Sequence, residues 1–273
     1  GESSFSHKER IDWLTESGPI TGAGKIALAD SWRAIGEPGK ALEAVRDAWH
    51  NNSLERDVER EVLSTYGKQL TQDDHRARVE FLLWTNQRTA ASKLKYLLTS
   101  DYRKLVDARI ALAARSRNVD ALVDAVPANL QDNPGLLYER AKWRRQKLRN
   151  QDVATPLLTG IDGNDIPEAG RSRLWDERNI AIRTDLKDGN WSRAYQLASP
   201  HGMESGGDFA EAEWVSGWIA LRLKNDADRS LQHFETMSDG VSTPISLARG
   251  KYWAGRARDA LGQPDAARTD YTA

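Results

Sequence analysis

The chain contains no cysteine, and this absence excludes two kinds of structure. Without thiols the protein can form neither a disulfide framework nor a thiolate metal site, although the cellular compartment stays open. Methionine and phenylalanine are also scarce, with two and four residues. Tryptophan, in contrast, occurs ten times and is spread along the chain. Large aromatic residues at separate positions suit a stacked array of helices.

Two further absences concern net charge and long apolar runs. The 39 basic and 40 acidic residues nearly cancel, so the chain has no overall attraction for nucleic acid or an anionic membrane. No apolar run approaches the roughly 20 residues that span a bilayer, so we expect no membrane span. The polar start GESS also lacks the pattern of a signal peptide. If the parent protein is exported, we expect this chain to be a mature or truncated form.

Segments rich in Ala, Leu, Arg, Glu and Lys alternate with short breaks, and no sustained period-two pattern indicates strands. The sequence therefore predicts an all-α fold. The predicted helices cover 5–17, 21–35, 39–51, 54–70, 71–86, 89–98, 102–116, 119–126, 134–149, 153–158, 171–187 and 191–198, with two helical hairpins over 208–273. In the third helix Ala41, Val45 and Trp49 form one stripe. In the fifth, Thr71 and Asp74 form a capping-box variant.

Similar turns recur along the chain, each with a Gly or Asn before an alanine that is expected to begin an inward helix face. They lie near Gly36, Asn118, Asn150, Gly189, Asn225 and Gly262. From Arg117 onward the spacing is roughly that of tetratricopeptide-like helix pairs, about 34 residues. This predicts an irregular α-α superhelix of stacked hairpins. Loop-like residues 160–170 predict a hinge or boundary between domains 1–160 and 171–273, unless the chain is one domain.

Residues 208–273 contain the clearest helical stripes and helix-end signals. The expected stripes are Trp214, Trp218 and Leu221; Ala227, Leu231 and Phe234; and Trp253, Ala257, Ala260 and Leu261. Thr243 and Pro244 are a suitable cap and first-turn residue for the third helix. Gly262 should end that helix, and Pro264 should begin a fourth.

Several ordered blocks in this stretch resemble the helical region of large soluble lytic murein transglycosylases. They are EAEW at 211–214, GWIALR at 217–222, HF at 233–234, TPISxAR at 243–249 and YWxGRA at 252–257, where x is any residue. Weaker blocks lie upstream, LTxxDHxxR at 70–78 and FLLW at 81–84. The motif positions expected to serve packing or a domain interface are Trp214, Trp218, Pro244, Arg249, Tyr252, Trp253 and Arg256.

The resemblance implies a periplasmic enzyme of the cell wall whose helical part is a scaffold. The parent activity cleaves the MurNAc–GlcNAc β-1,4 bond of peptidoglycan (murein) and forms 1,6-anhydro-MurNAc. The scaffold would guide glycan strands and contact the enzyme's own lysozyme-like catalytic domain. We expect that domain to be absent from this chain, and we expect a monomer that binds no nucleic acid.

The reaction needs one carboxylic acid that acts first as an acid and then as a base. The family pattern places this Glu before Ser, with a Gly-Leu-Met-Gln type segment further on. Glu16-Ser17 and Glu204-Ser205 match only the first part and fall in predicted turns. We therefore predict no catalytic residue in this chain.

No cofactor or metal site is predicted either. The five histidines are scattered, and Asp73-Asp74-His75 is best explained by acidic residues answering the helix dipole. His233 is expected to have a partly buried packing role.

Three basic features have alternative interpretations. The run Arg140–Arg149 is expected to be a solvated helix face with Leu137, Ala141 and Leu148 packed inward, although weak binding of nucleic acid or anionic glycan stays open. Arg249 and Arg256 are expected to contact a neighbouring repeat's carbonyls or a catalytic module.

Two other functional classes remain as alternatives to the scaffold. One is a free-standing tetratricopeptide-like adaptor that binds a protein or peptide. The other is a nucleic-acid binder with a basic face, for which no accompanying motif is present. Helical repeats serve many functions, so the fold by itself does not choose among the three classes.

Overall fold

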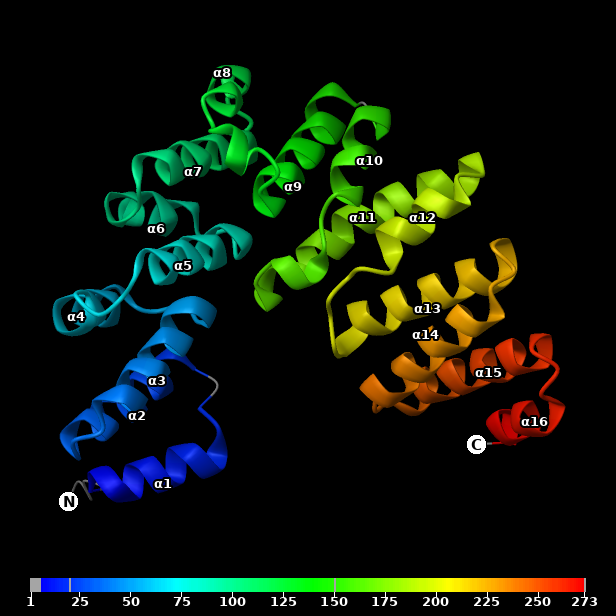
Figure 1. The fold of residues 1–273 in the computed structure, drawn as a ribbon, viewed down its shortest axis with the longest axis horizontal. Helices are drawn as coiled ribbons and strands as arrows, with labels where there is room; N and C mark the ends of the chain where they lie inside the picture. The colour runs from blue at the N-terminus through cyan, green and yellow to red at the C-terminus, as the bar shows by residue number, and fades with distance from the viewer. Residues whose placement is uncertain (1–5, 20, 150, 273) are drawn as a thin grey trace. The chain divides into compact units, whose positions relative to one another are not determined.

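The structure is a computed structural model that describes residues 6–19, 21–149 and 151–272. Every regular element within these ranges is a helix (Figure 1). This confirms the all-α prediction, and helices that follow one another in sequence pack together. The chain forms two compact units, Gly1–Ala111 with Asn118–Leu130, and Leu112–Arg117 with Gln131–Ala273.

The first unit consists of short helices joined by tight turns. Its elements are α1 (His7–Ser17), α2 (Gly22–Ala34), α3 (Pro38–Asn51), α4 (Arg56–Tyr66), α5 (Gln72–Trp84), α6 (Arg88–Lys93), the 3-10 turn Leu94–Leu97, α7 (Ser100–Ala113), α8 (Val119–Asp124) and the 3-10 turn Ala128–Leu130. The main packing partners are α1 with α2, α2 with α3, and α3 with α5.

The predicted stripe of α3 forms the centre of this packing. Ala41, Val45 and Trp49 are fully buried, as their spacing predicts. The capping box of α5 is also confirmed, because the Thr71 hydroxyl accepts from the Asp74 amide while the Asp74 carboxylate accepts from the Thr71 amide. The Asp74 carboxylate also accepts a hydrogen bond from Arg46 of α3 and lies 2.9 Å from Nε2 of His50, on the same helix. One carboxylate thus both caps α5 and joins it to α3.

The second unit contains longer helices arranged as successive hairpins. Its elements are α9 (Pro134–Trp143), the π turn Arg144–Leu148, α10 (Gln151–Thr159), the 3-10 turn Gly163–Asp165, α11 (Glu168–Asp188), α12 (Trp191–Ala198), α13 (Gly206–Leu223), α14 (Ala227–Gly240), α15 (Pro244–Ala260) and α16 (Pro264–Thr272). Each of α11 to α16 packs on the next (Figure 1). Because α11 also meets α13 and α13 meets α15, these alternate helices form one layer.

The helix ends of the last two hairpins follow the predicted signals. Thr243 accepts a hydrogen bond from the Ser246 amide at 3.3 Å, and Pro244 occupies the first turn of α15. Gly262 has a φ of +73°, a conformation that ends a helix and favours glycine, and α16 then begins at Pro264.

The inward alanine of the recurring turns is confirmed in most hairpins and wrong in two. Ala41, Ala194 and Ala267 are buried, but Ala121 is exposed and Ala227 only half-buried. In these two hairpins the buried positions near the turn belong to larger or polar residues, Val119 and Ser230. The turn therefore fixes where the helix begins, whereas the rotation of the helix decides which residue faces inward.

Two predicted stripe residues face solvent. Leu148 is 56% exposed, although Leu137 and Ala141 are buried as expected. The reason is the π turn at Arg144–Leu148, which takes an extra residue and rotates the following positions relative to an α-helix. Ala260 is also exposed, because it is the last residue of α15.

The predicted hinge at residues 160–170 lies inside the second unit. The Gly163 amide donates to the Pro200 carbonyl at 2.9 Å. Buried Arg178 donates to the carbonyls of Leu158 and Pro200, at 3.0 and 2.8 Å. These bonds join the loop to the connection between α12 and α13, while its role as a hinge stays a prediction.

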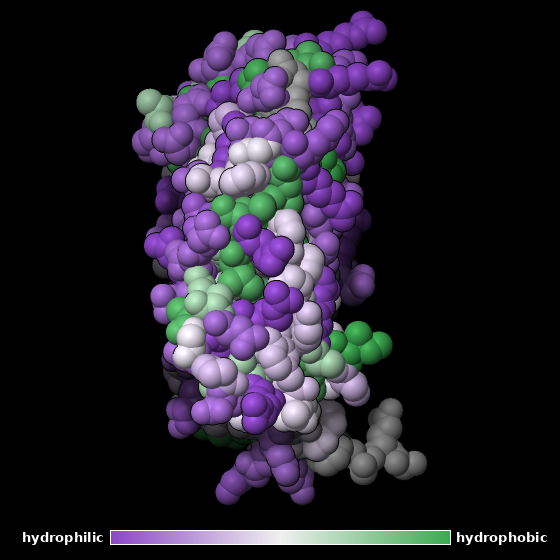
Figure 2. Space-filling model, turned by 90° about the vertical axis from the view of Figure 1, so that its right-hand side faces the viewer, coloured by the Kyte–Doolittle hydropathy of each residue, from purple (hydrophilic) through white to green (hydrophobic). Residues whose placement is uncertain are grey.

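Some predictions fall outside the described residues. They concern Gly1 to Phe5, Asn150 and Ala273, whereas Ala154, the inward alanine predicted after Asn150, is described and is buried. On the face drawn in Figure 2, hydrophobic and near-neutral patches form narrow strips between hydrophilic side chains.

Candidate functional site

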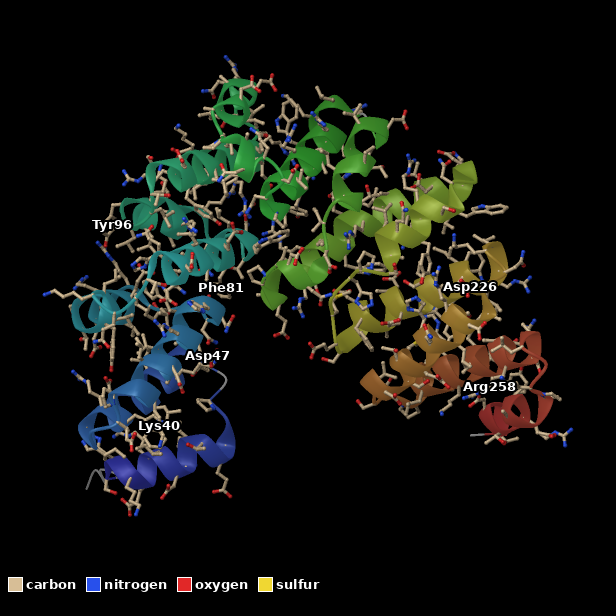
Figure 3. All side chains as sticks on the ribbon, viewed as in Figure 1. Lys40, Asp47, Phe81, Tyr96, Asp226 and Arg258 are labelled. Carbon is tan, nitrogen blue, oxygen red and sulfur yellow. The ribbon has the colours of Figure 1, made fainter. Side chains whose placement is uncertain are left out.

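Six of the seven motif positions meet on the second unit, where α13 and α15 lie in one layer. We call Trp214, Trp218, Arg249, Tyr252, Trp253 and Arg256 the aromatic–arginine surface. The Trp214 and Trp218 rings stack with centroids 6.3 Å apart, and Trp253 meets Trp214 edge-on at 6.1 Å. Tyr252 extends the row, with its ring 5.7 Å from Trp253. Figure 3 labels Arg258 near the end of α15, the helix that supplies four of these residues.

The row depends on the close approach of α13 to α14. A Cβ at Gly217 would lie 2.8 Å from the Phe234 ring, so only glycine lets the two helices pack at this distance. Phe234 is fully buried and stacks on Trp253 at 5.8 Å. Trp253 therefore joins α15 to Phe234 of α14 and to Trp214 of α13.

The tryptophans of this surface are half-buried, unlike Trp49, Trp84 and Trp175, which are fully buried. Arg249 places its guanidinium 3.9 Å from the centre of the Trp214 ring. Burial lowers the pKa of Arg249, and the charge of Glu211 opposes that shift. The indole Nε1 of Trp214 is buried and has no hydrogen-bond partner.

Such a surface has a defined binding chemistry. Aromatic faces attract cations and pack on apolar faces of flat or cyclic ligands. Guanidinium groups bind carboxylates through charge-assisted hydrogen bonds. The aromatic–arginine surface therefore suits an extended ligand that carries both ring faces and carboxylates.

The contacts of the two arginines are with aromatic residues. Arg249 and Arg256 are expected to contact a neighbouring repeat's carbonyls or a catalytic module; in the structure Arg249 covers Trp214, and Arg256 donates to the Tyr252 hydroxyl at 3.2 Å. A contact with a catalytic module stays a prediction. Pro244 begins α15 and lies apart from the row, where it shapes the helix start.

A buried polar network lies between α12, α13 and α14. Glu213 accepts from His233 Nδ1 at 2.5 Å and from His201 Nε2 at 3.0 Å. The Met203 amide donates to His201 Nδ1, which places the proton of this ring on Nε2. Tyr195 completes the chain, with its hydroxyl 2.9 Å from His233 Nε2.

The electrostatics of this network keep Glu213 ionised. Burial by itself would raise the pKa of Glu213, but hydrogen bonds from His201 and His233 outweigh it and hold that pKa below its ordinary value. A carboxylate that accepts from two imidazoles is a strong crosslink between helices. His233, predicted to have a packing role, is thus a hydrogen-bonding residue that joins α14 to α13.

The remaining sequence candidates lie apart from one another. Glu16 and Glu204 are both exposed, at the end of α1 and in the connection before α13. His75 is buried edge-on to Trp49. Across the ranges that the structure describes, no group of three or more His, Cys, Asp or Glu is placed to hold a metal.

The basic run of residues 140–149 contributes contacts within the second unit. Arg145 binds buried Glu177 through two nitrogens, one of them at 2.8 Å. Lys142 donates to the Tyr138 hydroxyl at 2.9 Å. At least these two basic side chains bind within their own unit.

Sequence reasoning missed the network around Glu213. Glu213 and His233 belong to the quoted blocks, but His201 and Tyr195 carry no local signal because their partners are distant in sequence. The signal available in the sequence was that Glu213 stands one residue before Trp214 in a helix with many apolar residues. Such a place favours burial, and a buried carboxylate needs hydrogen-bond partners.

Comparison of the chain with protein-family models, curated proteins and solved structures gives no match. None of the helices in the described residues is long and apolar enough to cross a membrane, in agreement with the sequence.

Proposed function

We propose that this chain is the non-catalytic helical scaffold of a periplasmic lytic murein transglycosylase and that its aromatic–arginine surface guides peptidoglycan strands. The observation that carries the proposal is that separate sequence blocks, at 211–222 and 243–257, form one continuous surface. Local helix formation does not require aromatic rings and arginines of separate blocks to lie side by side.

The chemistry of peptidoglycan fits this surface. Its glycan strands offer the apolar faces of successive sugar rings, and its lactyl-peptide groups offer carboxylates. Half-buried Trp218 and half-exposed Tyr252 supply ring faces, and Arg249 and Arg256 supply guanidinium groups along the same row, in which Arg249 covers Trp214. The cleavage that forms 1,6-anhydro-MurNAc would be performed by a catalytic domain of the parent enzyme.

The test is retention of the chain on insoluble sacculi, with digestion products followed by mass spectrometry. The wild-type chain should be retained and should release no anhydro-muropeptides. Trp214→Ala/Trp218→Ala should weaken retention by about tenfold or more, since aromatic anchors dominate binding surfaces. Trp191→Ala is the matched control, because Trp191 is a 44% exposed tryptophan on α12 of the same unit.

A second variant guards against loss of folding in the double mutant. Arg249→Gln removes the guanidinium charge and leaves the aromatic rings in place, so it should weaken retention and reduce its dependence on salt. Equal retention of all four proteins would refute a role for this surface. Release of anhydro-muropeptides by a pure preparation would show that a working carboxylate lies in the chain, and Glu204 would be mutated first.

The alternative function is a tetratricopeptide-like adaptor for a protein or peptide. One observation favours it, an open cavity on α15 and α16 lined by two half-exposed tyrosines. Retention on sacculi tests the scaffold proposal. The adaptor alternative is tested separately, by binding of a protein or peptide at this cavity.

A further inference from the structure

The layer of α11, α13 and α15 carries charged side chains beside the aromatic–arginine surface. Glu211 lies on α13, three residues before Trp214. One oxygen of its carboxylate accepts a hydrogen bond from the indole N–H of Trp175 on α11, at 3.3 Å. The other oxygen lies 3.9 Å from the guanidinium of Arg183, eight residues further along α11. Glu211 is therefore where the aromatic–arginine surface meets α11.

A second arginine reaches the same region from α15. Arg249 lies over the Trp214 ring, and the charge of Glu211 opposes the fall in pKa that burial causes at this guanidinium. The neighbours of α13 in the layer are α11 and α15, so the charges follow the order Arg183, Glu211 and Arg249 across three helices. We call these three residues the charge row. Positive, negative and positive groups alternate along it.

The carboxylate of the charge row keeps capacity for a ligand. The Glu211 side chain is 40% exposed. A carboxylate can accept about four hydrogen bonds, and across the described residues the bond from Trp175 is the one that Glu211 accepts. The contact with Arg183, at 3.9 Å, is longer than a hydrogen bond. The oxygen that faces Arg183 can therefore accept a hydrogen bond from a ligand.

The two arginines of the charge row also keep donors. Arg183 is 74% exposed and donates its Nε–H to the side chain of Asn179 at 3.2 Å. Arg249 is exposed and contacts the Trp214 ring. A guanidinium has five N–H donors, so each arginine can bind a carboxylate in addition to these contacts.

The order of the charges defines the ligand. A ligand with negative charge alone would be drawn to the two arginines and repelled by Glu211 between them. A ligand that carries an amino group between carboxylates matches all three charges. Exposed ion pairs add little to stability, because water and salt screen them. Binding therefore explains the charge row better than folding does.

We propose that the charge row binds a zwitterionic peptide segment, with the ammonium group of the segment on Glu211 and its carboxylates on Arg183 and Arg249. The inference rests on the proposed function and deepens it, because the stem peptides of peptidoglycan carry both carboxylates and free amino groups. Trp218 and Tyr252 hold sugar rings, and the charge row holds the attached peptide. Two chemically different contacts thus fix one strand.

Chemical modification of the ligand tests the ammonium contact. Acetylation of the free amino groups of isolated sacculi removes their positive charge and leaves sugars and carboxylates unchanged. Retention of the wild-type chain should be roughly three- to tenfold weaker on acetylated than on untreated sacculi, the effect of one partly exposed, charge-assisted contact.

A variant of the carboxylate shows where the ammonium group binds. Glu211→Gln keeps an acceptor oxygen for the Trp175 indole and removes the negative charge. It should be retained equally on untreated and acetylated sacculi. Glu235→Gln is the matched control, because Glu235 is a 48% exposed glutamate that contacts an arginine at 2.6 Å but lies on α14, outside the layer. It should respond to acetylation as the wild type does.

A variant of α11 tests the carboxylate contact. Arg183→Gln should weaken retention on untreated sacculi roughly threefold and make retention less dependent on salt, since exposed charge pairs are screened. Arg229→Gln is the control, because Arg229 is a 59% exposed arginine of α14. It should be retained as the wild type is.

The outcomes separate this inference from the scaffold proposal. Equal wild-type retention on both preparations, or a Glu211→Gln variant that still responds to acetylation, would overturn the charge row and leave the scaffold in place. Equal losses in Arg183→Gln and Arg229→Gln would overturn the carboxylate contact. No wild-type retention on either preparation would overturn both proposals. The wild-type comparison needs no variant, so it stays decisive even if a variant fails to fold.

Discussion

At the scale of single residues, Glu213 shows how a buried charge can hold helices together. It lies on α13 and accepts hydrogen bonds from His201 before α13 and from His233 on α14. A buried carboxylate is tolerated only when such partners replace water. The same residue type in an exposed position, such as Glu43, stays solvated and is expected to contribute little to stability.

Glu213→Gln should destabilise the folded chain at neutral pH by about 1–3 kcal/mol, because the new amide N–H₂ would face a ring N–H in place of an acceptor oxygen. The lowered pKa of Glu213 adds a dependence on pH. A carboxyl whose folded pKa is depressed contributes stability above its unfolded pKa, about 4.3, and loses it as the pH falls through the folded value.

Urea unfolding at several values of pH between about 3 and 7 measures this contribution. The wild-type chain should lose more stability than Glu213→Gln as the pH falls below about 4.3, so the two curves should converge in acid. Exposed Glu43→Gln is the control and should follow the wild type. Parallel curves for wild type and Glu213→Gln would contradict the role given to the two histidines.

At the scale of elements, the start of α5 is a local signal with a tertiary use. Thr71 and Asp74 satisfy each other's amides, as the sequence predicts. Burial would raise the pKa of Asp74, but bonds from the backbone and hydroxyl of Thr71 and the charge of Arg46 lower it below its usual value. Loss of the cap should therefore also weaken the contact of α5 with α3.

Thr71→Ala should lower the free energy of unfolding by about 1–2 kcal/mol, the upper part of the range for N-cap residues. Thr184→Ala provides the control, because its hydroxyl donates to the Ile180 carbonyl within α11 and caps nothing. Denaturant unfolding of both variants measures the difference. A Thr71→Ala protein as stable as Thr184→Ala would show that Asp74 is held by α3 alone.

At the scale of the whole molecule, the division into compact units depends on contacts between segments distant in sequence. The pattern of turns in the sequence does not reveal these contacts. The loop-like composition of residues 160–170 indicates a boundary, whereas the loop lies within the second unit and is bonded to Pro200. A Cβ at Gly163 would lie 2.1 Å from the His201 carbonyl oxygen, so the two segments approach as closely as glycine allows. Gly163, which makes this loop look flexible in the sequence, is therefore required by the close packing of the two backbones.

Gly163→Ala should therefore destabilise the second unit by about 2–4 kcal/mol, since the backbone must shift and a buried polar contact is lost. Gly160→Ala is the matched control in the same loop, because its Cβ would make only ordinary contacts, the nearest at 3.6 Å to Leu137. Denaturant unfolding and hydrogen exchange of the Gly163 amide measure the effect. Equal stability of the two variants would favour a loosely packed hinge.

The sequence by itself determined the class of fold, most helix ends and the central stripe of α3. These follow from capping, glycine and proline signals and apolar spacing, all of which act within a few residues. It also singled out all six residues of the aromatic–arginine surface, because the family-like blocks contain them. Only the tertiary structure decided that the rings form one row, that His201 and Tyr195 join Glu213, and that Leu148 faces solvent. The physical reason is that helix rotation and distant partners are set by packing between helices, and a single strained turn or a glycine that allows close approach changes both.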